Sequence, residues 1–96
     1  TSIPARYARA YAYHKDARVD LALAETDALL AAEPDNPYFL ELKGQVLLES
    51  GRPQEALVPL RRATELTRAH PLIAGILGHA LIATEKPDHF AEAESV

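Results

Sequence analysis

A repeat period of about 34 residues constrains the fold of this chain more than any other feature of its sequence. Small residues recur at this interval at Ala10, Gly44 and Gly78. The same shift aligns large apolar residues with one another, namely Tyr13 with Leu47 and Leu81, and Leu23 with Leu57. It also aligns Pro37 with Pro71. Because repeats of this length are typical of helix–turn–helix units, the period predicts a stack of similar helix pairs.

The length and composition favour one all-helical domain over residues 1–96. A chain of 96 residues suffices for one small domain with a modest core. Alanine and leucine are abundant, whereas β-branched and aromatic residues are sparse. The net charge of −4 disfavours nucleic acid as the partner, because phosphate binding requires a basic surface. No apolar run approaches the roughly 20 residues that direct membrane insertion of a helix requires.

Helix-breaking residues divide the chain at the same interval. The run Pro34-Asp35-Asn36-Pro37 predicts the end of one helix and the capped start of the next. Gly51 is predicted to end a helix in the left-handed conformation, and Pro53 suits the first turn of the helix that follows. We expect helices over residues 4–14, 19–32, 37–49, 53–67 and 71–84, and a short sixth helix over 88–94. Repeat one then covers residues 3–36, repeat two 37–70, and a partial third repeat 71–96.

Small residues also predict where paired helices approach each other. We expect Ala10, Gly44 and Gly78 in the first helices to face Ala22 and Ala56 in the second helices. In the first helix we expect the following residues to pack: Ala8, Tyr11 and Ala12. The alternative interpretation is an ordinary amphipathic bundle that matches the period by coincidence.

The residues at these positions resemble the tetratricopeptide repeat (TPR) family. The matching positions are Leu40, Gly44, Leu47, Ala56, Leu60 and Ala63 in the middle repeat, Ala10, Tyr13, Ala22 and Pro34 in the first, and Leu77, Gly78 and Leu81 in the third. The resemblance implies a right-handed superhelical stack of antiparallel helix pairs, with five to six helices in this chain. The chain departs from the family at Arg9 and Lys43, where leucine is usual, and at Thr26, where a large apolar residue is usual.

A narrower resemblance rests on several runs between Ala22 and Glu85, among them Glu33-Pro34-Asp35-Asn36-Pro37 and Glu41-Leu42-Lys43-Gly44-Gln45. They are similar to the C-terminal repeat region of BepA-type bacterial zinc metallopeptidases. In that family a peptidase domain with a His-Glu-x-x-His zinc motif precedes the repeats, and the repeats recruit substrates or partners. The resemblance implies a place in the bacterial periplasm or envelope; without it, we predict only a soluble protein. The chain begins without methionine and ends abruptly, so we expect a piece of a longer protein.

Catalytic and cofactor-binding motifs are missing from the sequence. There is no cysteine, and the four histidines His14, His70, His79 and His89 include no pair at the i, i+4 spacing of helical zinc ligands. No glycine-rich phosphate loop and no Gly-x-Ser-x-Gly elbow occur. We therefore predict no catalytic residue, no metal and no cofactor in this chain.

The first helix of each pair usually lines the concave face of such a stack. Projecting the family register predicts the following candidate binding residues: Tyr7, Tyr11, His14, Lys15, Tyr38, Glu41, Leu42, Gln45, Leu48, Leu72, Gly75, His79 and Ile82. Aromatic and aliphatic groups with a few polar ones suit an extended or helical peptide. The lysine–asparagine clamp with which some TPR proteins hold a C-terminal carboxylate is replaced here by Tyr7, Tyr11 and Glu41. Packing is an equal alternative for Tyr11, Leu42 and Leu48.

The leading functional hypothesis is a protein–protein interaction module that belongs to a larger zinc metallopeptidase. The alternative is a stand-alone TPR scaffold or assembly factor with no attached enzyme, and the third hypothesis is an enzyme in its own right. Because the last helix is short, we expect Leu77, Leu81 and Ile82 to lack full cover. They would then meet either missing residues of a longer protein or a second copy of the chain.

Overall fold

The computed structural model describes residues 2–68, 71–84 and 92, and describes only the backbone at residues 71 and 72. The described residues form five helices and no strand. They are α1 (Ile3–Lys15), α2 (Val19–Ala32), α3 (Pro37–Glu49), α4 (Pro53–Leu66) and α5 (Pro71–Ala83). The predicted all-helical class is confirmed, and each predicted helix boundary agrees within one residue. The sixth helix expected over 88–94 lies outside the described residues, apart from Glu92.

The helix boundaries repeat at the interval found in the sequence. Both ends of α3 lie one period after those of α1, both ends of α5 lie one period after those of α3, and both ends of α4 lie one period after those of α2. The turns repeat as well, because Ala17 and Gly51 have left-handed φ angles of 57° and 82°. Their backbone N–H groups donate to equivalent carbonyls, those of His14 and Leu48. The period therefore describes backbone conformation as well as residue type.

The starts of α1 and α3 are capped by side chains at equivalent positions. The Ser2 hydroxyl accepts a hydrogen bond from the Ala5 N–H at 3.3 Å. The Asn36 side-chain oxygen accepts from the N–H groups of Tyr38 at 2.9 Å and Phe39 at 3.3 Å. Each cap satisfies backbone donors that have no partner inside the helix. The capped start predicted at the Asp-Asn pair is confirmed for α3.

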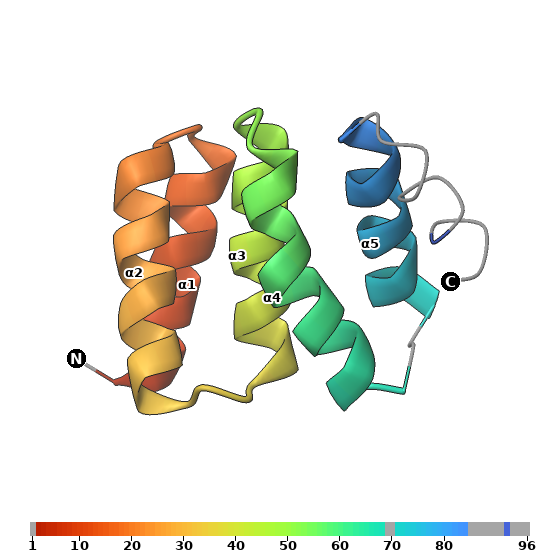
Figure 1. Cartoon of the computed structure of the whole chain (residues 1–96). Coiled ribbons are helices and arrows are strands. Elements are labelled where there is room, and N and C mark those ends of the chain that lie inside the picture. The colour runs from red at the N-terminus through yellow and green to blue at the C-terminus, as the bar shows by residue number, and fades with distance from the viewer. Residues whose placement is uncertain (1, 69–70, 85–91, 93–96) are drawn as a thin grey trace.

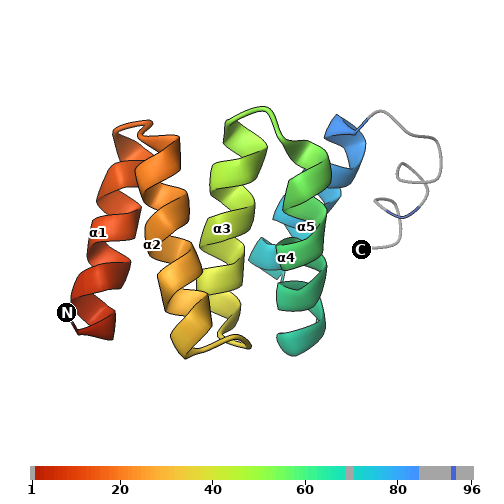
Figure 2. The ribbon, with the colours of Figure 1, turned by 60° about the vertical axis from the view of Figure 1, so that its left-hand side comes forward.

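The five helices lie side by side in chain order and alternate in direction (Figures 1 and 2). Helix α3 also contacts both α1 and α5, whereas no comparable contact joins α2 to α4 in the described part of the chain. In Figure 1, α2 and α4 lie in front of α1 and α3. The structure thus has two faces, and we call the one formed by the odd-numbered helices the α1–α3–α5 face.

The hydrophobic core runs through α3, which buries side chains on two sides. On one side, three α3 residues pack with residues of α1 and α2: Phe39, Leu42 and Val46 with Ala10, Ala22 and Leu29. On the other side, two buried α3 residues pack with residues of α4 and α5: Leu47 with Ala56, Leu57, Leu60, Leu77, Ala80 and Leu81, and Leu40 with Ala63 and Ile73. Because α3 is shared, the helix pairs are packed into one continuous core.

The close approaches predicted at small residues are confirmed in part. Ala10, Ala22 and Ala56 are fully buried, and Gly44 and Gly78 are buried too.

The prediction that Ala8, Tyr11 and Ala12 pack is wrong, because all three are exposed. Among the described helices, α1 contacts α2 and α3 alone, so less of its surface is covered by them than that of the central helix α3.

The expectation that the last helix leaves its leucines without cover is also wrong. Leu77 is 2% exposed and Leu81 is fully buried, because both pack against the leucines of α3 and α4. Ile82 is 54% exposed. The apolar surface of α5 that is open to a partner is therefore smaller than the sequence predicted.

Two basic residues, Arg9 of α1 and Lys43 of α3, form ion pairs with α2. Arg9 of α1 donates to Glu25 of α2, with 3.0 Å between Nε and Oε1. Lys43 of α3 pairs with Asp27 of α2, with 2.8 Å between Nζ and Oδ1. Each of these basic residues thus reaches a carboxylate on the same neighbouring helix.

Helices long and apolar enough to cross a bilayer are not found in the part of the chain that the structure describes.

Candidate functional site

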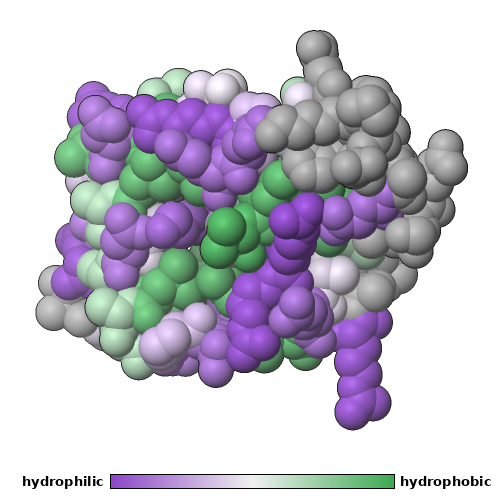
Figure 3. Space-filling view, in the orientation of Figure 1, coloured by the Kyte–Doolittle hydropathy of each residue, from purple (hydrophilic) through white to green (hydrophobic). Residues whose placement is uncertain are grey.

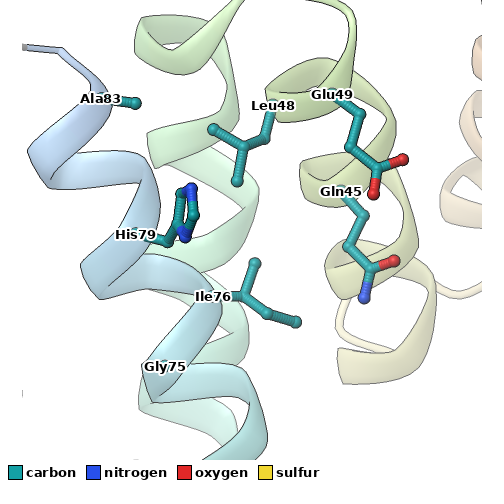
Figure 4. Close-up of a pocket in the computed structure, with 7 residues that line it drawn as sticks. All are labelled: Gln45, Leu48, Glu49, Gly75, Ile76, His79 and Ala83. Carbon is teal, nitrogen blue, oxygen red and sulfur yellow. The ribbon is translucent and has the colours of Figure 1, made fainter.

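A groove opens between α3 and α5 on the α1–α3–α5 face (Figure 4). Its volume is about 600 Å³, and it is lined by Gln45, Leu48, Glu49, Gly75, Ile76, His79 and Ala83. Figure 4 shows Gln45 and Glu49 extending from α3, and Ile76 and His79 extending from α5. The groove combines aliphatic walls with an amide, a carboxylate and an imidazole, a mixture suited to a peptide side chain and its backbone.

Small residues on α5 create this groove. Gly75 and Ala83 stand one period after Glu41 and Glu49, so a hydrogen atom and a methyl group replace two long side chains. A Cβ atom added to Gly75 would meet nothing within 4 Å among the described residues. Its backbone is ordinary helix, so no left-handed conformation requires glycine there. Gly75 therefore serves to leave space beside α3.

Longer side chains that contact one another stand at the corresponding place between α1 and α3. The His14 ring contacts Tyr11 edge-on at 6.1 Å between ring centroids. His14 also pairs with Glu49, with 3.1 Å between Nε2 and Oε2. The Lys15 ammonium lies 5.7 Å from the centre of the Tyr11 ring. The α1–α3–α5 face thus has two halves: aromatic and charged side chains cover the half between α1 and α3, and the groove occupies the half between α3 and α5.

A half-buried carboxylate lies between the two halves. The Gln45 side-chain amide donates a hydrogen bond to Glu41. Burial raises the pKa of Glu41, and the hydrogen bond from Gln45 and the charge of His14 oppose this rise. Burial also raises the pKa of Tyr7, with a further contribution from the charge of Glu41. Because Gln45 both lines the groove and binds Glu41, the two halves share one residue.

The structure brings most of the predicted binding residues onto this face. Gln45, Leu48 and His79 line the groove together with Gly75. Ring contacts, ion pairs and hydrogen bonds connect others on α1 and α3: Tyr7, Tyr11, His14, Lys15 and Glu41.

The remaining predicted residues have other positions. Tyr38 is 65% exposed in the first turn of α3. Leu42 is fully buried, so the packing interpretation is correct for that residue. Ile82 is exposed but does not line the groove, and the Leu72 side chain lies outside the described residues.

Three groove residues were absent from the predicted set: Glu49, Ile76 and Ala83. The period itself could have identified them. A shift of one period carries Lys15 to Glu49 and on to Ala83, and carries Leu42 to Ile76.

A scan against protein-family models finds none that matches this chain. A search of the curated proteins finds no match either. The geometry of the groove and the repeated helix boundaries therefore carry the functional argument.

The opposite face has a smaller hollow of about 340 Å³. It is lined by Leu23, Asp27, Lys43, Leu47, Arg52, Glu55, Val58 and Pro59. Figure 3 shows a broken band of apolar side chains across this face, with hydrophilic side chains around it. Two ion pairs border the hollow, Lys43 with Asp27 and Arg52 with Glu55. Among the described residues, no group of three or more His, Asp or Glu side chains could hold a metal ion on either face.

Proposed function

We propose that this chain is a TPR-type interaction module that binds a peptide segment of another protein in the α3–α5 groove. The observation that carries the proposal is the groove itself, which lies on the face of the first helix of each pair. A volume of about 600 Å³ falls within the usual range of roughly 300–1,000 Å³ for ligand sites. Its aliphatic walls supply buried area, and Gln45, Glu49 and His79 supply hydrogen-bonding groups.

Repeated helix boundaries support the TPR part of the proposal. The first and second helices recur at the constant interval of the sequence period, with equivalent caps and turns. Helix pairs of the same geometry that each pack on the next pair in the same way form a superhelix. We therefore extend the proposal to a right-handed superhelical stack. The concave side of that stack would then be the α1–α3–α5 face.

The setting of the module is a separate part of the proposal. The runs that resemble BepA-type metallopeptidases support a role as the partner-recruiting region of such an enzyme, in the periplasm or envelope. Reading the gene upstream of Thr1 tests this point. An open reading frame without a His-Glu-x-x-His helix would remove the peptidase and leave a stand-alone scaffold.

Panning of a phage-displayed random peptide library on the immobilised chain tests peptide binding, with a groove-filling variant as the comparison. Gly75→Leu places a large side chain where a Cβ meets open space, so it should fill the groove without disturbing the fold. We expect enriched peptides to bind the wild type and to bind Gly75→Leu at least about tenfold more weakly. Ala24→Gln is the matched control, because Ala24 is an exposed residue of α2 that does not line the groove. Enrichment of no peptide, or equal binding to Gly75→Leu, would contradict the proposal.

A further inference from the structure

Glu41 differs from the other carboxylates of the described chain in its partners. It is half-buried and accepts a hydrogen bond from the neutral Gln45 amide, but no lysine or arginine of the described residues pairs with it. The other carboxylates that are not exposed, Glu25 and Glu92, both pair with arginine. Taking a carboxylate partly out of water without a cation costs free energy. A cation supplied by a ligand would recover part of that cost.

Three tyrosines of α1 and α3 lie in the neighbourhood of this carboxylate, with Tyr7 in the middle. Tyr7 and Tyr11 lie 6.1 Å apart between ring centroids, and Tyr7 interacts electrostatically with both Glu41 and Tyr38. Tyr38 precedes Glu41 by three residues on α3, so the two share one side of that helix. Aromatic ring faces attract ammonium and guanidinium groups. We call Tyr7, Tyr11, Tyr38 and Glu41 the tyrosine–glutamate site.

We propose that the tyrosine–glutamate site binds a lysine or arginine side chain of the peptide that occupies the α3–α5 groove. This inference rests on the proposed function and adds the chemistry of the ligand. The cation would pair with the Glu41 carboxylate and lie against the tyrosine rings. Gln45 connects this site to the groove, so an adjacent apolar residue of the same peptide would lie between Leu48 and Ile76.

A residue of the chain itself already uses one of these rings for a cation. The Lys15 ammonium lies 5.7 Å from the Tyr11 ring centre, which shows that the ring is accessible to such a group. Among the described residues, His14 also faces the site: it pairs with Glu49, and its charge acts on Glu41 as well. Lys15 therefore competes with a ligand cation for Tyr11 and repels it. Removing Lys15 should strengthen the binding of a cationic peptide, whereas it would weaken the binding of an anionic one.

Peptide pools with one fixed residue test the ligand chemistry. Four pools of random nonapeptides carry lysine, arginine, norleucine or glutamate at the central position, and fluorescence anisotropy measures their affinity for the chain. We expect the lysine and arginine pools to bind about fivefold more tightly than the norleucine pool, and the glutamate pool to bind most weakly. Norleucine keeps the length and apolar character of lysine without its charge, so it isolates the contribution of the cation.

Three variants assign the preference to the site. Glu41→Gln keeps the size of the side chain and should reduce the preference for lysine over norleucine to within about twofold. Asp20→Asn removes an equal charge from an exposed position on α2, and should leave the preference unchanged. Lys15→Met should increase the affinity for the lysine pool by about two- to threefold. A lysine preference that survives Glu41→Gln, or that Asp20→Asn removes equally, would overturn the inference.

The norleucine pool separates this inference from the proposed function. If it binds the wild type and loses binding in Gly75→Leu, the groove binds peptides. Equal affinity for all four pools would then refute the tyrosine–glutamate site alone. Absence of binding by every pool would refute both the site and the proposed function.

Discussion

Gly44 of α3 lies against Leu60 of α4 so closely that a Cβ atom on Gly44 would overlap the Leu60 side chain. The residues one period earlier are Ala10 and Thr26, and both are fully buried. In the first pair of helices the larger Ala10 thus lies opposite the smaller Thr26. In the second pair the smaller Gly44 lies opposite the larger Leu60. The first helix of the pair carries the larger side chain in one case and the second helix in the other, so both pairs fill the contact between their helices.

A double-mutant cycle tests this complementarity. Gly44→Ala should destabilise the chain by about 1–2 kcal/mol, because the clash with fully buried Leu60 exceeds the gain of about 1 kcal/mol from replacing a helical glycine. Leu60→Thr alone should cost about 2–4 kcal/mol through the cavity that it leaves. In the double variant, which copies the first helix pair, we expect a favourable coupling of about 1 kcal/mol by urea denaturation. Strictly additive effects would show that the two side chains do not compete for space.

Gly75→Ala should have the opposite sign to Gly44→Ala. A Cβ on Gly75 meets open space, so only the higher helix propensity of alanine contributes, and we expect a gain of about 0.5–1 kcal/mol. Thermal unfolding by circular dichroism provides the measurement. A loss of stability would mean that the groove is narrower than the structure indicates.

The turn after α1 contains a residue that glycine would suit better. Ala17 is exposed and has a φ of 57°, whereas the equivalent turn after α3 contains Gly51. Ala17→Gly should stabilise the chain by about 0.5–1 kcal/mol, because the left-handed conformation strains alanine more than it costs glycine in chain entropy. Ala12→Gly, at an exposed position inside α1, is the control and should cost about 1 kcal/mol. Equal effects of the two changes in chemical denaturation would contradict the assigned conformation.

Asn36 caps α3, the helix that the two halves of the core share. Asn36→Ala removes an acceptor for two backbone N–H groups and should lower the free energy of unfolding by about 1 kcal/mol. Asn36→Asp keeps the acceptor and adds a charge that the helix N-terminus favours, but it loses the amide that donates to Glu33 at 3.3 Å. The two effects oppose each other, so the stability should stay within a few tenths of a kcal/mol. If alanine were tolerated as well as aspartate, the cap would contribute nothing.

The stability of the chain should depend on pH through Glu41. Burial raises the pKa of this carboxyl above its unfolded value, so its contribution is present below the unfolded pKa and lost as pH rises through the folded pKa. Glu41→Gln removes that titration. Relative to the variant, the wild type should therefore lose stability as the pH rises from the ordinary carboxyl pKa of 4.5 through the raised folded pKa, by less than about 1 kcal/mol because solvent screens this half-exposed group. Parallel stability profiles of the two proteins in urea would contradict this expectation.

The repeat period predicted the helices and their ends because it reflects local chemistry. Asn36 caps a helix by bonding to N–H groups two and three residues away, and Gly51 ends one through its own φ angle. Such effects act within a few residues of the chain. The period also placed Gly44 at a close approach between helices, since a glycine inside a helix usually has a packing reason.

Burial and the groove depended on the tertiary structure. Tyr11 and Leu42 share the predicted binding stripe, yet Tyr11 is exposed and Leu42 is fully buried, because α1 contacts two helices and α3 contacts four. The groove requires Gly75 and Ala83 of α5 to lie beside Gln45 of α3, which stands about one period earlier in the chain. The sequence by itself therefore determined the repeat, the helix boundaries and the caps, which arise from interactions between near neighbours. Only the packing of α1, α3 and α5 decided which side chains are buried, which half-buried carboxylate of the described residues has no lysine or arginine partner, and where the space is left.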